Sequence, residues 1–284
     1  MYDDREQKYA QRVEIVTAWL HRSGECLLLI SVYGRDNLLM IPAEFTRVLA
    51  ALIPFASRWQ DITFRGIVAM ALETLAGINE ADVRCSRASI FTTSLSRANT
   101  QQPSTKWGFL GLLNEPRISN FSFRGAGRDI LTFPVRWAGM TELYIVHSGR
   151  NPHGPCEPFD RAVEILAMCS QLRTCRLTVE DRDRSFVATA AFQVDLACLH
   201  SLSIKSVRLP VIRTQGRFSF VSFPALRHLD LYGGGDVPAY DEEATTYAPF
   251  PTHATAPHLE ALEISTNLFG TAEALAGLPC GLPP

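Results

Sequence analysis

Four polar residues in two short segments carry side chains that hydrolytic enzymes use. Ser201 and Ser203 lie two residues apart, and so do His228 and Asp230. A serine hydrolase needs a hydroxyl nucleophile, a histidine base and a carboxylate that orients the histidine. The corresponding hypothesis is a serine hydrolase-like α/β enzyme that uses Ser203, His228 and Asp230.

Other features of the sequence disfavour catalysis at these residues. Hydrolysis also needs an oxyanion hole and a site that excludes water, and an open face of polar strands supplies neither by default. The G-x-S-x-G turn that presents the nucleophile of α/β hydrolases does not occur in the chain. We therefore expect no enzymatic activity, and the hydrolase remains the alternative.

Two further segments resemble ligand sites only in part. His147, His153 and Cys156 carry possible metal ligands, but their spacing matches no standard zinc module and no fourth ligand is evident. The glycine run in YGGGDVPAY is not accompanied by the lysine and the Ser/Thr of a phosphate-binding loop. We expect the chain to hold neither a metal nor a cofactor.

The segments that carry the serines and the histidine share a pattern of apolar residues. FPALRHLDLYGGG, residues 223–235, places leucines in the pattern L-x-x-L-x-L, and the same pattern recurs with other apolar residues allowed. Copies begin at residues 27, 59, 118, 140, 172, 199, 226 and 259. If one degenerate copy lies between 59 and 118, the mean spacing is about 29 residues, at the upper edge of the range for leucine-rich repeats.

This repetition predicts an α/β leucine-rich-repeat solenoid, with parallel strands on the concave face and helices or irregular segments on the convex face. The first, fourth and sixth positions of each copy would pack inward. Outer helices are predicted at 43–53, at 161–169 and in the opening segment, where Tyr9, Val13, Val16 and Leu20 have helical spacing. An ordinary α/β sandwich is the alternative. We predict strands at 59–64, 118–123, 140–146, 172–179, 199–204, 226–231 and 259–264.

The repeats predict one leucine-rich-repeat domain over residues 1–284, with two irregular regions. The part from about 65 to 115 fits the pattern poorly and is interpreted as a degenerate repeat. Residues 236–257 contain four prolines and three consecutive acids, Asp241, Glu242 and Glu243. Such a composition offers little apolar surface to offset the entropy of ordering, so we predict a mobile insertion.

Several phrases of the sequence resemble one known family. VTAWLHRSGECLLLISVYG, VLAALIPFASRWQDITF, ILAMCSQLRTCRLTV and FPALRHLDLYGGG occur in an order similar to that in the leucine-rich region of F-box proteins of mushroom-forming fungi. The resemblance extends from about residue 13 to 265, and each phrase alone has low specificity. It implies a protein-protein interaction module, the substrate-recognition region of an F-box subunit of a cullin-type ubiquitin ligase.

The F-box itself is not part of this resemblance. Family members carry this helical motif upstream of the repeats, and only about a dozen residues precede the similar region here. We therefore expect binding to the ubiquitin-ligase adaptor only if an upstream F-box exists, and we interpret the chain as a truncated family member.

Composition limits the other partners. The net charge is −2 and no basic block is present, so nucleic acid is not expected as a partner. No apolar segment has the length of a membrane span or a signal peptide, and the seven cysteines are odd in number and scattered. We expect a monomeric cytoplasmic or nuclear protein with reduced thiols and no membrane contact.

The repeat pattern also predicts which side chains meet a target protein. The third and fifth positions of each copy face away from the core, and their polar side chains would form the binding face. The same residues would occur on a face that is merely solvated. The residues predicted to contact an unidentified target protein are Glu142, Tyr144, Arg176, His228, Asp230 and Glu263.

Overall fold

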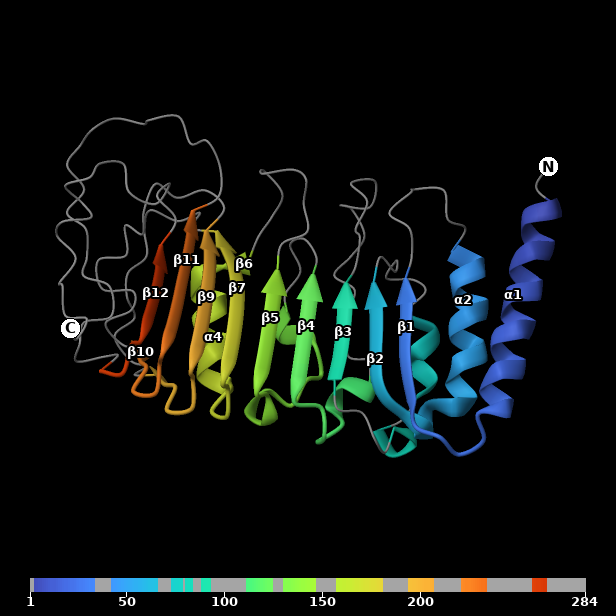
Figure 1. The fold of residues 1–284 in the computed structure, drawn as a ribbon, viewed down its shortest axis with the longest axis horizontal. Helices are drawn as coiled ribbons and strands as arrows, with labels where there is room; N and C mark the ends of the chain where they lie inside the picture. Colours follow the sequence, from blue (N-terminus) through green and yellow to red (C-terminus); the bar gives the residue numbers. More distant parts are fainter. Residues whose placement is uncertain are drawn as a thin grey trace. The chain divides into compact units, whose positions relative to one another are not determined.

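The computed structural model describes eleven ranges of the chain: 3–33, 42–65, 73–78, 80–83, 88–92, 111–124, 130–146, 157–180, 194–206, 221–233 and 257–264 (Figure 1). It is a mixed α/β structure with parallel strands. The chain divides into two compact units, Met1–Arg136 and Trp137–Pro284. A single repeat domain over residues 1–284 stays a prediction. The insertion predicted at 236–257 lies outside the described ranges except for its last residue.

The first unit contains two helices, one before β1 and one between β1 and β2, and parallel strands in the order β1-β2-β3-β4. The helices α1 and α2 contact each other and lie beyond β1 (Figure 1). Short 3-10 segments take the place of longer helices between the later strands. The elements are α1 Asp3–Arg22, β1 Leu28–Tyr33, α2 Pro42–Leu52, a 3-10 helix Ile53–Arg58, β2 Trp59–Arg65, β3 Ala88–Thr92 and β4 Asn120–Arg124.

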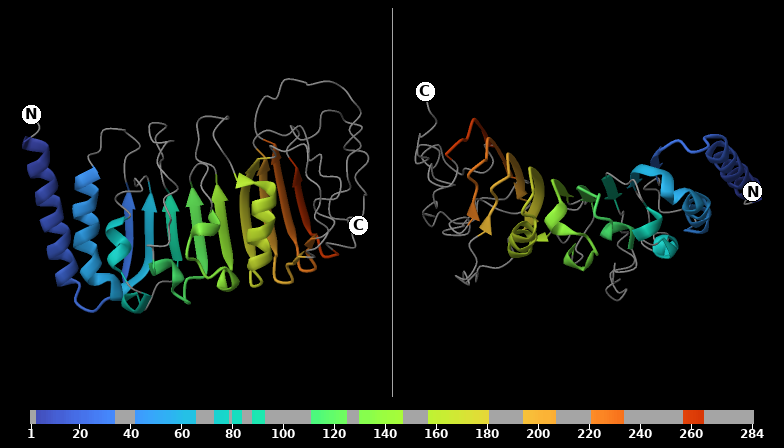
Figure 2. Two further views of the ribbon diagram at one scale, coloured as in Figure 1. Left: turned by 180° about the vertical axis from the view of Figure 1, so that it is seen from behind. Right: turned by 90° about the horizontal axis from the view of Figure 1, so that it is seen from below.

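The second unit contains parallel strands in the order β5-β7-β9-β11-β12. The helix α4 packs against β7 on the side of the strands that Figure 2 shows from behind. A short strand, β6, pairs with β7, while β8 and β10 form a separate parallel pair. The elements are β5 Glu142–Val146, β6 Glu157–Pro158, α4 Phe159–Met168, β7 Thr174–Glu180, β8 Val194–Asp195, β9 Ser201–Ser206, β10 Val221–Ser222, β11 His228–Gly233 and β12 Ala261–Ile264.

The strands pair in the register that the leucine pattern predicts. In the second unit, fourth positions align with fourth positions, as Leu202 does with Leu229 and Leu229 with Leu262. The parallel pairing is therefore confirmed for the described strands. Each of the later strands begins two residues after the start of the pattern, because the first position lies in a turn. Its amide donates to the carbonyl three residues back, as in Leu199 to Leu196 and Leu226 to Phe223, both at 3.1 Å.

The degenerate copy predicted between residues 59 and 118 contains a strand. β3 pairs with β2 on one side and with β4 on the other. Its register assigns Ser89 to the fourth position, opposite Ile62 and Phe121. A search for apolar residues at the fourth position therefore misses this copy.

The apolar positions of the pattern build the core. Their side chains are buried in the copies that begin at residues 59, 118, 140, 172, 199 and 226, whereas most alternate residues on the same strands are less buried. The alternation follows from the period of two in a strand. Buried members are Trp59, Ile62, Phe64, Ile118, Phe121 and Phe123 in the first unit and Met140, Leu143, Ile145, Leu172, Cys175, Leu177, Leu199, Leu202, Ile204, Leu226, Leu229 and Leu231 in the second.

The first copy was predicted one residue too early: Leu27 is 52% exposed, and the buried Leu28 is the residue that pairs with Trp59. In the last copy Leu262 is 36% exposed and Leu259 and Ile264 are half-buried, so its apolar positions are not part of the buried core.

The predicted outer helices form near the expected residues. α2 covers most of 43–53, and α4 covers 161–168 of the predicted 161–169. In α4 the predicted stripe of Ala162, Ile165 and Leu166 is buried. In α1, Leu20 is buried and Val13 and Val16 are half-buried.

Arg58, which directly precedes β2, forms hydrogen bonds with the end of α1 and with the connection that follows it. Its guanidinium donates to the carbonyls of Cys26 at 2.9 Å and Leu20 at 3.1 Å, and to the Ser23 hydroxyl at 2.6 Å. It also lies 5.6 Å from the ring centre of Phe55. The bond to Leu20 satisfies a carbonyl group in the last turn of α1, which has no partner within the helix, and the other two acceptors lie in the connection from α1 to β1.

We expect Arg58→Ala to lower the free energy of unfolding by about 1.5–3 kcal/mol, because it removes charge-assisted hydrogen bonds to three acceptors. Chemical denaturation measures this change. Arg58→Lys keeps the charge but not the planar arrangement of donors, so we expect it to recover only part of the loss. A change below about 0.5 kcal/mol for Arg58→Ala, the range of ordinary surface substitutions, would contradict this role.

Candidate interaction surface

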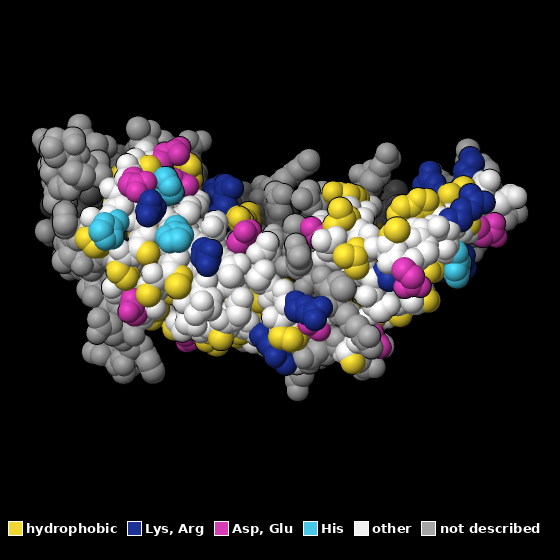
Figure 3. All heavy atoms as spheres, turned by 60° about the horizontal axis from the view of Figure 1, so that its bottom comes forward, with side chains coloured by type: hydrophobic (Ala, Val, Ile, Leu, Met, Phe, Trp, Pro, Cys, Tyr) yellow, Lys and Arg dark blue, Asp and Glu magenta, His cyan; other side chains and the backbone are white. Residues whose placement is uncertain are grey.

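The face of β5, β7, β9, β11 and β12 that is opposite α4 carries the third and fifth positions of the pattern. We call it the strand face. Figure 3 shows histidine, acidic and basic side chains over its β9, β11 and β12 end. All of the residues predicted to bind a target occur on these strands. The third positions are Glu142, Thr174, Ser201, His228 and Ala261, and the fifth positions are Tyr144, Arg176, Ser203, Asp230 and Glu263.

The fifth positions form one row, because each is the register partner of the next. Tyr144 pairs with Arg176, Arg176 with Ser203, Ser203 with Asp230 and Asp230 with Glu263. Neighbouring strands lie about 4.8 Å apart, so adjacent members of the row are close enough to contact one ligand side chain. Arg176 and Glu263 are exposed, and Tyr144 and Asp230 are half-buried.

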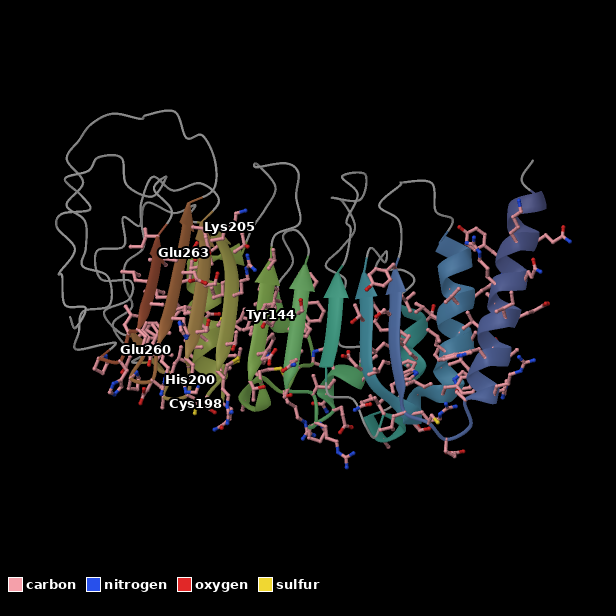
Figure 4. All side chains as sticks on the ribbon, in the orientation of Figure 1. Tyr144, Cys198, His200, Lys205, Glu260 and Glu263 are labelled. Carbon is pink, nitrogen blue, oxygen red and sulfur yellow. The ribbon has the colours of Figure 1, made fainter. Side chains whose placement is uncertain are left out.

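Tyr144, which Figure 4 labels, shares a hydrogen bond with Glu142, two positions before it on β5. Partial burial raises the pKa of the Tyr144 phenol, and the charge of Glu142 and its hydrogen bond with the phenol raise it further. The positive charge of Arg176 on the next strand acts in the opposite direction. At neutral pH the phenol therefore stays protonated and donates a hydrogen bond.

A second tyrosine on the strand face was missed by the sequence patterns. Partial desolvation raises the pKa of the Tyr232 phenol, and the charges of Asp230 and Glu263 raise it further, as does a hydrogen bond with Glu263. Tyr232 lies two residues after the fifth position and pairs in register with Lys205. Extending the alternation of the strand by two residues would have identified both side chains.

The edge of the strands where each pattern begins is also charged. The second positions Arg173, His200, Arg227 and Glu260 are all exposed, and Figure 4 labels His200 and Glu260 near this edge. Arg227 and Glu260 form an ion pair at 3.1 Å. Both side chains are more than half exposed, so the pair adds little to stability. The carbonyls of Arg173, His200 and Arg227 each accept two amides of the next repeat, as Arg173 does from His200 and Ser201 at 2.8 and 3.1 Å.

The possible catalytic residues share this face but are not arranged as a catalytic triad. Ser203 is the register partner of Asp230, and His228 is the partner of Ser201. Ser203 is only 8% exposed, whereas the His228 side chain is exposed to solvent. A triad needs the histidine between the serine and the carboxylate. Register instead sets Asp230 directly opposite Ser203.

Two predicted features of possible ligand sites fall partly or wholly outside the described ranges. His147, His153 and Cys156 are not among the described residues. Of the glycine run at 233–235, only Gly233 is described. Within the described ranges, no group of three or more His, Cys, Asp or Glu residues could hold a metal ion.

Cysteine reactivity provides a check on the burial of the repeats. Cys169 and Cys175 are buried free thiols, whereas Cys26 is exposed. Burial raises the pKa of Cys169 to about 12, and burial together with the nearby Cys169 raises that of Cys175. Only the thiolate reacts with alkylating reagents.

We therefore expect iodoacetamide at pH 9 to modify Cys26 and to leave Cys169 and Cys175 unmodified until the chain unfolds. Peptide mass spectrometry after timed labelling measures each site separately. Unfolding in denaturant before labelling is the control, because all three thiols should then react. Equal rates at Cys26 and Cys175 in the folded protein would show that this part of the core is open.

Among the helices of the described ranges, none combines the length and the apolar composition that are needed to cross a membrane. The chain was also compared with protein-family models, with curated proteins and with solved structures. None of these comparisons finds a match.

Proposed function

We propose that this chain is a leucine-rich-repeat solenoid that binds a target protein through the strand face of its second unit. The observation that carries the proposal is the unbroken register of β5, β7, β9, β11 and β12. The core positions of each repeat stack on those of the next, so the third and fifth positions of all five strands occupy the opposite face. Such rows of variable polar side chains are the usual binding surfaces of repeat proteins.

The side chains of the strand face suit a protein ligand. Tyr144 and Arg176 are neighbours in the fifth-position row, and tyrosine and arginine are enriched where interface energy concentrates. Glu142, Asp230 and Glu263 lie around them, so the complementary surface carries basic groups. Complementary charge acts mainly on the association rate and on the orientation of the partner.

The proposal extends to the role of the family that the sequence resembles. In that family, the repeats select a protein for ubiquitin transfer by a cullin-type ligase. We propose the same substrate-recognition role in the cytoplasm or nucleus. Contact with the ligase adaptor would require an F-box upstream of the resembling region, and the transcript upstream of Met1 is where to look for one.

A binding role is favoured over the hydrolase alternative. The serine of the alternative site, Ser203, is nearly buried, and its register partner is a carboxylate rather than a histidine. A hydrolase assay with activated esters distinguishes the two roles, because Ser203→Ala would abolish an activity that depends on this site.

Affinity purification with matched variants tests the binding role. Proteins retained by the wild-type chain would be compared with those retained by a double variant, Tyr144→Ala with Arg176→Ala. Arg161→Ala is the control, because Arg161 is an exposed arginine on α4, away from the strand face, and pairs with Glu164. We expect the target to be retained by the control and lost by the double variant. A set of proteins that is identical for all three baits would refute the proposal.

A further inference from the structure

The helix α1 has a second apolar face beside the one that packs into the first unit. Its packing stripe includes Val16 and the buried Leu20. Arg12, Ile15, Trp19 and Arg22 follow one another at intervals of three or four residues, which places them along one adjacent side of the helix. All four are exposed, with Ile15 at 61% and Trp19 at 57%.

β1 carries further exposed apolar side chains in the same unit, although the element that packs against α1 is α2. Leu29 is 72% exposed and Tyr33 is 60% exposed, and Leu27 precedes the strand with 52% exposure. We call Ile15, Trp19, Leu27, Leu29 and Tyr33 the N-terminal patch. Figure 3 shows yellow side chains, with Lys and Arg side chains among them, at the end of the first unit where α1 lies.

The connection between α1 and β1 holds the two parts of the N-terminal patch together. The amide of Ser23 donates to the carbonyl of Trp19 at 2.9 Å, and the amide of Cys26 donates to the carbonyl of Ser23 at 3.1 Å. Arg58 binds the carbonyls of both Leu20 and Cys26. Trp19 and Leu27 are thus joined by a hydrogen-bonded turn rather than by a loose linker.

The N-terminal patch is larger than isolated exposed residues would explain. Single apolar side chains on a surface are normal, but contiguous patches of several hundred Å² usually mark an interaction site. Five large side chains on α1, on β1 and in their connection are each more than half exposed, which exceeds what single scattered residues would give. The strand face of the second unit is mostly polar. We therefore expect the strand face and the N-terminal patch to bind different ligands.

We infer that the N-terminal patch binds an amphipathic helix of another protein whose apolar face is flanked by carboxylates. Arg12 and Arg22 stand at the two ends of the exposed face of α1, with Ile15 and Trp19 between them. Ten residues of helix separate the arginines, which corresponds to about 15 Å along the axis. A ligand helix that lies along α1 would place acidic residues about ten positions apart, with apolar residues at helical spacing between them.

The arrangement of charge favours this ligand over a second copy of the chain. Antiparallel pairing of α1 with its own copy, centred between Ile15 and Trp19, would bring Arg12 of each chain against Arg22 of the other. Like charges in register are unfavourable. A membrane surface fits less well, because α1 already packs its main apolar stripe within the protein and Glu14 is exposed on the same helix.

Selection from a peptide library tests this inference independently of the strand face. The probe is a phage-displayed library of helix-forming peptides of about 18 residues, or five helical turns. On the wild-type chain we expect enrichment of peptides with aliphatic or aromatic residues at helical spacing and Asp or Glu near both ends. Trp19→Ala should lower the affinity for the most strongly bound peptide about tenfold or more, whereas Glu14→Ala should leave this affinity unchanged.

Reversing the charge of the two arginines tests the role of the flanking carboxylates directly. The double variant Arg12→Glu with Arg22→Glu should select peptides that carry Lys or Arg at the flanking positions, and circular dichroism should show unchanged helix content. The inference is overturned if no helical peptide is enriched, or if binding is unaffected by Trp19→Ala. Dimerisation that Trp19→Ala abolishes, or patch-dependent binding to phosphatidylserine vesicles without peptide binding, would assign the N-terminal patch to another ligand and also overturn it.

Discussion

Replacing Phe121 by alanine is expected to lower the free energy of unfolding by about 3–5 kcal/mol. Phe121 occupies the fourth position of its repeat and is fully buried in the first unit. Its ring meets that of Phe133 edge-on at 5.5 Å, and Phe123 lies 5.2 Å from the same ring. Removing the ring leaves a cavity among residues of the strand and of the following segment, which cannot close it without moving the backbone.

Denaturant unfolding of Phe121→Ala and of a neighbouring control measures this effect. Ser122→Ala changes the next residue of β4, which is not buried in the core, so its effect should stay within about 0.5 kcal/mol. A loss below about 1 kcal/mol for Phe121→Ala would mean that the fourth position does not build the core. The repeat interpretation of the first unit would then be wrong.

The second large effect concerns binding. Tyr144→Ala and Arg176→Ala are each expected to raise the dissociation constant for the target about tenfold or more, which corresponds to a loss of about 1.4 kcal/mol of binding free energy. Tyr144 offers an aromatic ring and a phenol that Glu142 orients, and Arg176 offers exposed donors one strand away. Truncating either residue removes contact area from the β5–β7 end of the proposed interface while leaving the buried positions of the pattern unchanged.

Isothermal titration with the purified target measures these affinities. Arg161→Ala provides the matched control, because it also removes an exposed arginine but from α4. Unfolding midpoints of the three variants should match that of the wild-type chain. Unchanged affinity in both Tyr144→Ala and Arg176→Ala would remove the strand face from consideration.

Much of the sheet could be predicted from the leucine pattern. Side chains alternate along a strand, so residues at equal positions of the pattern must pair if the repeats stack. This reasoning predicted that Leu229 pairs with Leu202 and with Leu262, as it does. The pattern could not locate β3, because a polar Ser89 stands where an apolar residue is expected. It also extended the strands by two residues, because the first position lies in a turn that the apolar pattern does not mark.

The surfaces were harder to predict than the core. The alternation identified the third and fifth positions, but the hydrogen bonds of Tyr144 and Tyr232 depend on the distances between particular side chains. The exposed face of α1 could have been found from the spacing of Arg12, Ile15, Trp19 and Arg22. It was missed because the neighbouring stripe with Val16 and Leu20 already explains why the helix packs against the first unit.

Site-specific photocrosslinking tests the central claim most directly. A benzophenone amino acid would be introduced at residue 144 on the strand face and, in a separate variant, at residue 161 on α4, and both proteins would be irradiated with the target. The proposed function predicts a crosslinked product at residue 144 and none at residue 161. Crosslinking at residue 161 with no product at residue 144 would show that the target binds elsewhere and would contradict the proposed function.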